Sequence, residues 1–215
     1  MHAELKVREL QRKLYRAAKA QPQRTFGILH DKVCSDVVVR VAFELVRRNR
    51  GAAGVDGITI ESIEASGVER FLEEIHEELR QETYRPMPVR RVFIPKGDGK
   101  QRPLGIPRVK DRVVQAAVKL VIEPLFEASF RPTSFGFRPK RSAHDAIQAI
   151  RREVYRGKED VIDLDLKSYF DTIDQRILME LVRRRVRDPR VLRLIKLLLR
   201  AGVMDDGSWK ESDLG

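Results

Sequence analysis

Residues 89–106 read VRRVFIPKGDGKQRPLGI and decide how the middle of the chain folds. Val89–Ile94 has the β-branched and aromatic composition of a strand, and Gln101–Ile106 provides a second strand after it. Between them, Lys96–Lys100 supplies the Asp-Gly chemistry of a tight turn. The stretch therefore predicts a β-hairpin with a basic tip.

Apolar residues at helical spacing occupy most of the chain on either side of this hairpin. Asp36 and Ser142 are predicted N-caps, and Ser66 with Glu69 forms a capping-box pattern. Pro124 should kink or divide the helix that contains it. The predicted helices cover residues up to 20, from 36, from 66, 111–128, from 142, 174–186 and 189–201. A short hairpin is predicted over 203–209.

Residues 161–166, VIDLDL, predict a short strand whose side chains could bind a metal ion. Alternation puts the three aliphatic residues at even positions on one face, and Asp163 and Asp165 on the other. Carboxylates held in this way are ligands that Mg²⁺ takes. An ordinary half-exposed strand with acidic residues on its wet side shows the same pattern. The strand alone leaves both interpretations open.

Two further features point toward nucleotides. Arg90, Lys96 and Arg102 lie along one basic strip of the hairpin, where they could hold a triphosphate, although a solvated hairpin tip has the same composition. Phe170 follows Asp165 closely and could wall the sugar of a nucleotide or fill the core.

The charge balance narrows the partner class. The chain has 43 Lys and Arg against 32 Asp and Glu, which gives a net charge of +11 and a pI of about 10.0. This excess favours polyanions, with nucleic acid ahead of an anionic membrane surface, unless the basic surface is merely solvated. The single cysteine excludes an internal disulfide, and the four scattered histidines give no zinc-ligand spacing. Without a signal-peptide core or a membrane-length apolar run, we expect a cytoplasmic, nucleic-acid-associated protein.

Five blocks, in order, resemble the fingers and first palm motifs of group II intron reverse transcriptases of the maturase kind. This resemblance runs from about Thr25 to the last residue, and five ordered blocks are far more specific than any one motif. The blocks are GAAGVDG at 51–57, IPKGDGKQRPLGIP at 94–107, DRVVQ at 111–115, SFGFRP with SAHDA between 134 and 146, and DLDLKSYFDTID at 163–174.

The resemblance implies roles for single residues. Asp165 would be the catalytic, metal-binding aspartate, with the carbonyl of Leu166 as a backbone ligand, and Phe170 would sense the 2′ position of the nucleotide. Arg24–Leu29 resembles a segment that closes over the template. The residues implied to contact the incoming deoxynucleoside triphosphate are Lys96, Arg102 and Arg90.

In the family, two Mg²⁺ ions assist addition of deoxynucleotides to a DNA primer opposite an RNA template. That chemistry needs a further aspartate pair from a Tyr-Ala-Asp-Asp-type hairpin, and Asp205-Asp206 lacks the Tyr-Ala lead-in. We therefore expect this chain to bind intron RNA without polymerising by itself, its two-metal site being incomplete. The candidates for docking on intron RNA, unless they form a solvated face, are Arg8, Arg12, Lys13, Arg16, Lys19 and Arg24.

The expected fold class is α+β, with reverse-transcriptase fingers and an incomplete palm. The expected division is 1–50 for the N-terminal helices and template-lid segment, 51–158 for the fingers with the start of the palm, and 159–215 for the first part of the palm. The open palm edge could be covered by a homodimer. The expected function is part of an RNA-directed DNA polymerase that also serves RNA splicing and intron mobility. A non-catalytic RNA-binding module and a reverse transcriptase of a CRISPR-associated or other bacterial system are the alternatives.

Overall fold

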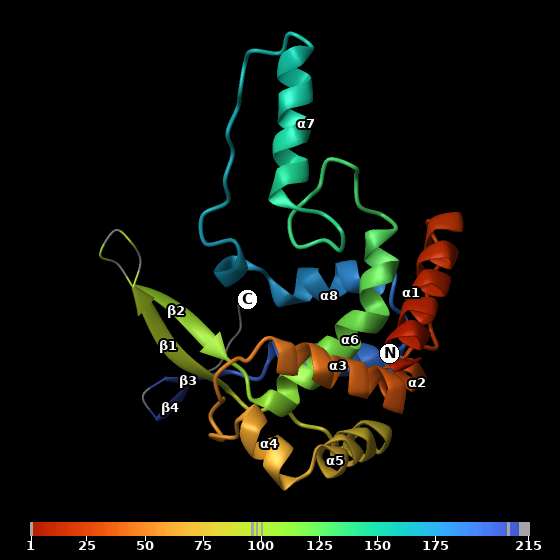
Figure 1. The fold of residues 1–215 in the computed structure, drawn as a ribbon, viewed down its shortest axis with the longest axis vertical. Coiled ribbons are helices and arrows are strands. Elements are labelled where there is room, and N and C mark those ends of the chain that lie inside the picture. The colour runs from red at the N-terminus through yellow and green to blue at the C-terminus, as the bar shows by residue number, and fades with distance from the viewer. Residues whose placement is uncertain (1, 96, 98, 100, 206, 211–215) are drawn as a thin grey trace.

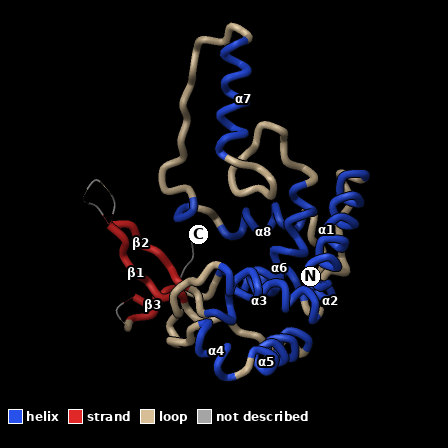
Figure 2. Tube along the Cα trace, viewed as in Figure 1, coloured by secondary structure: helices blue, strands red, loops and turns tan. Residues whose placement is uncertain are grey.

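The computed structural model describes residues 2–210 apart from 96, 98, 100 and 206, and shows a mixed helix and sheet architecture (Figures 1 and 2). The predicted α+β class is confirmed. The elements are α1 His2–Ala20, α2 His30–Val33, α3 Asp36–Arg48, α4 Ile60–Ser66, α5 Val68–Arg80, β1 Val89–Pro95, β2 Gln101–Ile106, α6 Val109–Glu127, α7 Ala143–Tyr155, the 3-10 helix η1 Phe170–Thr172, α8 Gln175–Arg183, α9 Pro189–Leu199, β3 Val203–Asp205 and β4 Ser208–Lys210.

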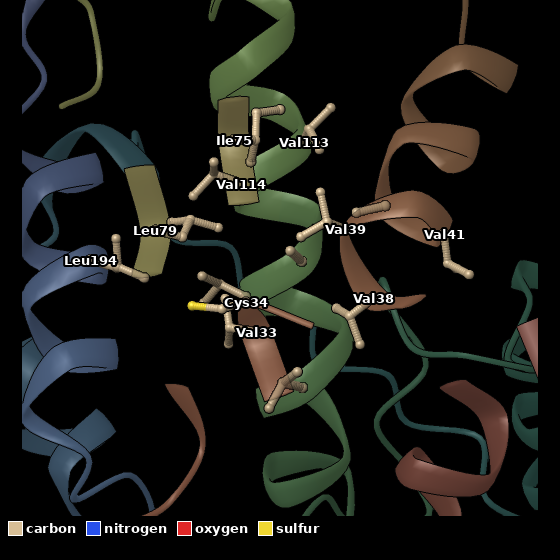
Figure 3. Close-up of a cluster of buried hydrophobic side chains, with 14 of the residues drawn as sticks. Val33, Cys34, Val38, Val39, Val41, Ile75, Leu79, Val113, Val114 and Leu194 are labelled. Atoms are coloured by element: carbon tan, nitrogen blue, oxygen red, sulfur yellow. The ribbon is translucent and has the colours of Figure 1, made fainter. Parts of the chain in front are cut away.

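Helix α6 is the central element of the core. Its apolar residues are buried on several sides, and it packs against α1, α2, α3 and α9. Figure 3 shows side chains of α3, α5 and α9 meeting around it. Cys34 is buried in this cluster, where desolvation raises the pKa of its thiol to about 12 and keeps it neutral. Pro124 lies inside α6 without dividing it.

The helix starts differ from those predicted at two places. Ser35, not Asp36, caps α3, because its hydroxyl accepts the Val38 N–H at 3.4 Å. Ser66 ends α4 instead of beginning α5, so the predicted capping box there was wrong. The predicted cap at Ser142 is confirmed, with its hydroxyl accepting the Asp145 N–H at 3.2 Å.

The sheet joins two hairpins that lie far apart in the sequence. Both hairpins were predicted, but the strand order β2-β1-β3-β4 includes a parallel contact of β1 with β3, with Val89 opposite Val203. Nothing in the alternation of either hairpin signals this contact, because it depends on where α9 delivers the chain. The hairpin of residues 89–106 is thereby anchored at the base of its first strand.

The predicted strand at 161–166 was wrong. These residues have no regular secondary structure, and their side chains are exposed. They return from the far end of α7, which projects from the body, to η1 (Figure 1). A strand needs a neighbouring strand that satisfies its backbone hydrogen bonds. Residues 161–166 form no backbone hydrogen bond with any other described residue. The division at residues 50 and 158 stays a prediction.

Arg185 connects the ends of two helices to the N-terminal loop. It is buried, and its guanidinium donates to the carbonyls of Ala18 and Leu125, both at 3.1 Å, in the last turns of α1 and α6. These carbonyls have no partner within their helices, and a cation at a helix C-terminus is also favoured by the helix dipole. The same group donates to the carbonyls of Pro22 and Arg24 in the loop after α1.

Asp188 places a buried negative charge at the N-terminal ends of two helices. Its fully buried carboxylate accepts N–H groups of Leu29 and His30 at 2.8 and 2.9 Å, where α2 begins, and of Arg190 at 3.0 Å, where α9 begins. Burial alone would raise the pKa of Asp188, but these backbone donors outweigh it and hold the pKa below its ordinary value.

A backbone bridge lies between these two side chains. Phe26 donates to the carbonyl of Arg185 at 2.9 Å, and Arg187 donates to the carbonyl of Phe26 at 2.8 Å. The loop of residues 21–29 is therefore fixed by a segment about 160 residues further along the chain.

Replacing Arg185 should test this attachment. Arg185→Met leaves four carbonyls without their donor, so we expect the free energy of unfolding to fall by roughly 3 kcal/mol. Urea unfolding followed by circular dichroism measures it. Arg184→Met, at an exposed neighbour, is the matched control and should change stability little. Equal effects of the two substitutions would contradict the role given to Arg185.

The Asp188 carboxylate should make stability depend on acid pH. Because its folded pKa is depressed, its contribution is fully present above the ordinary value of 3.8 and is lost as the pH falls through the folded pKa. Asp188→Asn should therefore cost about 2 kcal/mol at pH 7. The gap between variant and parent should narrow below about pH 3.8. Urea unfolding across pH measures this, and a gap that does not depend on pH would refute it.

Candidate nucleic-acid interface

One groove of about 670 Å³ gathers basic side chains from α1 and from the loop after α6. Arg8, Arg12 and Arg16 stand four residues apart, so they share one face of α1 with a spacing of about 6 Å. Lys140 faces them from the loop, and Tyr15 adds an aromatic side chain. None of these four cations has a salt-bridge partner among the described residues.

The acidic residues of this groove are neutralised locally. Glu127 binds Arg138 through a hydrogen bond of 2.6 Å, and Glu123 lies 3.5 Å from Lys119. Arg138 also donates to the carbonyls of Arg131 and Ser134 at 2.8 and 2.7 Å. Arg138 thus folds residues 131–138 back onto the end of α6, which places Lys140 at the groove. The local excess of positive charge suits a phosphate backbone.

The structure separates the five basic residues predicted on α1. Lys13 pairs with Glu9 at 2.8 Å, and Lys19 donates to the carbonyl of Ala128 at 3.2 Å, beyond the end of α6. Neither lines the groove, whereas the three arginines do. Lys140 was missed because its approach to α1 depends on the path of the loop after α6, and Tyr15, which lies on α1 itself, was not singled out. The signal available in the sequence was the basic run Arg138–Arg141.

Another groove, of about 800 Å³ between α3 and α5, has the opposite character. It is lined by Asp36 and by four glutamates between 69 and 77, with Arg40 and Arg70 as counter-charges. Its carboxylates repel phosphate, so this face does not fit nucleic acid.

The N-terminal loop presents a small exposed surface next to its buried attachments. Arg24 lies 5.2 Å over the ring of Phe26, whose own side chain is buried. Ile28 is 73% exposed, and a side chain at Gly27 would meet open space. The predicted template-lid segment is therefore a rigidly held loop with a free tip.

The hairpin does not bring Arg90 and Arg102, two of its three predicted basic residues, together. Arg90 lies opposite Ile106 and Arg102 lies opposite Ile94, so the two arginines share a face but stand about 13 Å apart along the strands. Arg90 donates to the carbonyl of Ala53 at 2.8 Å, whereas the exposed Arg102 makes no such hydrogen bond with another described residue. Lys96 lies outside the described residues.

The predicted metal ligands lie on residues 161–166, here called the acidic segment, and are exposed to solvent. Asp163, Asp165 and Leu166 are exposed on the extended stretch before η1. Phe170, in η1, is also exposed, with its ring centroid 5.2 Å from that of Tyr169. Asp205 is not part of this group, because it pairs with Lys210 at 2.8 Å in the second hairpin. Asp206 lies outside the described residues.

The chain is similar to known proteins in sequence and in fold. A family model described as reverse transcriptase (RNA-dependent DNA polymerase) matches residues 94–212. The chain belongs to the reverse transcriptase family. The match runs from the end of β1 through β2, α6, the acidic segment and the second hairpin, so the expected family is confirmed.

Two bacterial proteins are similar in sequence to this reverse transcriptase. Protein YkfC of Escherichia coli is 38% identical over 97% of this chain and 56% of its own length. Group II intron-encoded protein LtrA of Lactococcus lactis subsp. cremoris is 35% identical over 81% of this chain and 29% of its own length. The chain thus spans only about half of one relative and under a third of the other.

A solved structure shows a similar fold. A chain of a partial Cas6-RT-Cas1–Cas2 complex aligns with a TM-score of 0.52 and 18% sequence identity, over 87% of the reverse transcriptase chain and 31% of that chain. At this identity the likeness concerns the fold alone. Within the residues that the structure describes, no helix has both the length and the apolar character that a membrane crossing needs.

The two hairpin arginines should behave differently on substitution. Arg90→Gln removes a charge-assisted hydrogen bond to Ala53, so we expect it to lower the free energy of unfolding by about 1 to 2 kcal/mol. Arg102→Gln, at an exposed position, should change it by less than about 0.5 kcal/mol. Urea unfolding of both variants measures the difference, and an equal loss of stability in both would contradict the assignment.

Proposed function

We propose that this chain is the RNA-binding fingers and first palm portion of a group II intron reverse transcriptase. This proposal rests on the basic groove between α1 and the 131–141 loop, in a chain that belongs to the reverse transcriptase family. Its cations form no salt bridge among the described residues, which leaves them able to exchange counterions for phosphates.

The groove fits the backbone of structured RNA better than a free nucleotide. Arg8, Arg12 and Arg16 repeat along the helix at a spacing similar to that between neighbouring phosphates of one strand. Such contacts supply affinity and register without reading sequence. Tyr15 lies among them and offers a ring against which an unpaired base can stack.

The proposed substrates follow the family. Deoxynucleoside triphosphate would meet Lys96 and Arg102, with Arg90 as a more distant contributor because it holds the Ala53 carbonyl. Phe170 would lie against the sugar, and Arg24 with the exposed Ile28 would meet the RNA template. In the whole protein these contacts would serve template-directed DNA synthesis on a primer, RNA splicing and intron mobility.

Mg²⁺ is the implied cofactor, and the chain supplies part of a site for it. Asp165, with Asp163 two residues away, offers the carboxylate oxygens that Mg²⁺ prefers, and the Leu166 carbonyl is a further oxygen. No three His, Cys, Asp or Glu side chains gather around one point in the described part of the chain. We propose that Asp165 holds a cation together with phosphate oxygens and with groups from outside the described residues.

Two other functions use the same surface. In a non-catalytic RNA-binding module, the groove would act and Asp165 would be vestigial. In a reverse transcriptase of a CRISPR-associated system, the polymerase chemistry would stay and the RNA would differ; the likeness to the Cas6-RT-Cas1–Cas2 chain is compatible with this, but it concerns the fold alone. The higher identity to an intron-encoded protein favours intron RNA. We place the protein in the cytoplasm, and a homodimer stays a prediction.

RNA titrations across salt test the groove. The affinity of the chain for its intron RNA should fall when Arg8, Arg12 and Arg16 are replaced together by Gln. The slope of log affinity against log salt should flatten by about 0.7 to 0.9 for each phosphate that the variant no longer neutralises. Lys13→Gln is the matched control, because this exposed lysine of the same helix is paired with Glu9.

The same titration with an unrelated structured RNA of equal length tests whether binding is specific for the intron RNA. Tighter binding of the intron RNA would show that this chain recognises it, and equal binding would assign specificity to other parts of the whole protein. A flattening caused by Lys13→Gln as large as that of the triple variant would contradict the groove and leave only diffuse charge.

A further inference from the structure

A second basic pocket lies between α8 and α9 and shares no lining residue with the groove on α1. Its volume is about 150 Å³. Four of its lining residues are cations, and none of those that the structure describes is acidic. The function proposed above makes no use of this pocket. The lining residues are Gln175, Arg176, Met179 and Arg183 of α8, Lys196 and Leu199 of α9, and Arg200 directly after α9.

Helical spacing brings the four charges to one place. Arg176 and Arg183 are seven residues apart, which is about two turns, so they share one face of α8. Lys196 and Arg200 are four residues apart and therefore lie side by side at the end of α9. Like charges gathered around a pocket of this size repel one another, because salt at physiological strength screens charges only beyond about 8 Å. A bound anion would remove this repulsion.

The floor of the pocket is apolar and held in place. Met179 is buried, and Leu199 is half-buried. Gln175 joins the two helices, because its side-chain amide donates to the carbonyl of Leu199 at 3.2 Å. Apolar groups on one side of a charge keep water away from it and so strengthen its attraction for an anion.

Three of the four cations have their donor groups available. Arg183, Lys196 and Arg200 form neither a hydrogen bond nor a salt bridge with another residue in the described part of the chain, whereas Arg176 lies 3.9 Å from the carboxylate of Asp174. Cations are favoured at helix C-terminal ends by the helix dipole, which accounts for their presence there. They do not, however, bind the terminal carbonyls, so their hydrogen-bond donors can meet a ligand.

We infer that the pocket between α8 and α9 binds a phosphate or diphosphate group. The guanidinium groups of Arg183 and Arg200 match the geometry of phosphate oxygens, and Lys196 adds a compact positive charge. The pocket has room for one such group and is too small for a stretch of duplex. Free diphosphate and the phosphorylated end of an RNA both carry this chemistry, and the experiment below separates them. The inference goes beyond the proposed function and does not depend on RNA binding by α1.

Calorimetric titration of the full chain with sodium diphosphate, without Mg²⁺ and at constant ionic strength, tests this pocket. The titration is repeated on the chain in which Arg8, Arg12 and Arg16 are all replaced by Gln. We expect both proteins to bind diphosphate with similar affinity, because the α1 groove is not the site. Failure of the α1 groove to bind RNA and failure of this pocket to bind diphosphate are therefore separate results.

Substitutions on the two helices locate the site. Arg183→Gln combined with Lys196→Gln should lower the affinity for diphosphate by about tenfold or more, because each lost charge-assisted contact is worth about that much. Arg184→Gln combined with Arg193→Gln is the matched control, since it removes two exposed cations of the same helices that do not line the pocket. It should leave the affinity nearly unchanged. Arg200→Gln, outside the helices, should weaken binding independently, and circular dichroism confirms that each variant is folded.

Competition with RNA identifies the source of the phosphate. If the ligand is an RNA end, an oligoribonucleotide with a 5′ phosphate displaces diphosphate from the α1 variant, and the same sequence with a 5′ hydroxyl does not. If neither displaces it, the ligand is the free anion. Equal displacement by both would overturn the inference, because a surface that binds backbone phosphates does not distinguish the two ends.

Two further results would overturn the inference. Absence of diphosphate binding to the full chain would show that the pocket takes no phosphate group. An equal loss of affinity in the pocket variant and in its matched control would show that only the diffuse charge of the chain attracts the anion.

Discussion

The turn between α8 and α9 is the constraint on which the rest of the structure depends. Within four residues it places a buried cation at the C-terminal ends of α1 and α6, and a buried carboxylate at the N-terminal ends of α2 and α9. Each charge is satisfied by helix-end backbone groups that would otherwise lack partners. The helix positions and the two buried side chains therefore determine one another.

This constraint links the core to the candidate interface. Helix α6 is held at its C-terminal end by Arg185, and the loop that begins there carries Lys140 to the basic groove. Helix α1 is held at its own C-terminal end by the same guanidinium, which sets the opposite wall. The groove is therefore formed between two elements whose relative placement depends on one buried side chain.

The sequence predicted local structure well and long-range contacts poorly. The β1–β2 hairpin, the capped helix after Ser142 and the second hairpin follow from turn chemistry and periodicity, which act over a few residues. Arg185 and Asp188 were not singled out, because a charged residue between two helices is usually solvated and nothing local reveals burial. The same limit applies to Asp111, which lies in the first turn of α6 close to its predicted start, and whose carboxylate also accepts the Tyr84 hydroxyl at 2.6 Å. For the candidate interface, the spacing of the arginines on α1 could be predicted from the sequence. The position of Lys140 could not, because it depends on the three-dimensional path of the loop after α6. The strand prediction at 161–166 was wrong because alternation shows which side chains share a face, but it does not show whether a neighbouring strand is present to pair with the backbone.

The bridge between Phe26 and the 185–187 segment also affects synthesis on the ribosome. The loop after α1 cannot take its final place until Asp188 has been added and has left the exit tunnel, because its anchoring groups come from that turn. At about 5 to 20 residues per second, this delay is on the order of ten seconds. Helices α3 and α6, which pack against α1, precede this turn in the chain, so during that time α1 can already pack while the loop after it still lacks its anchoring groups.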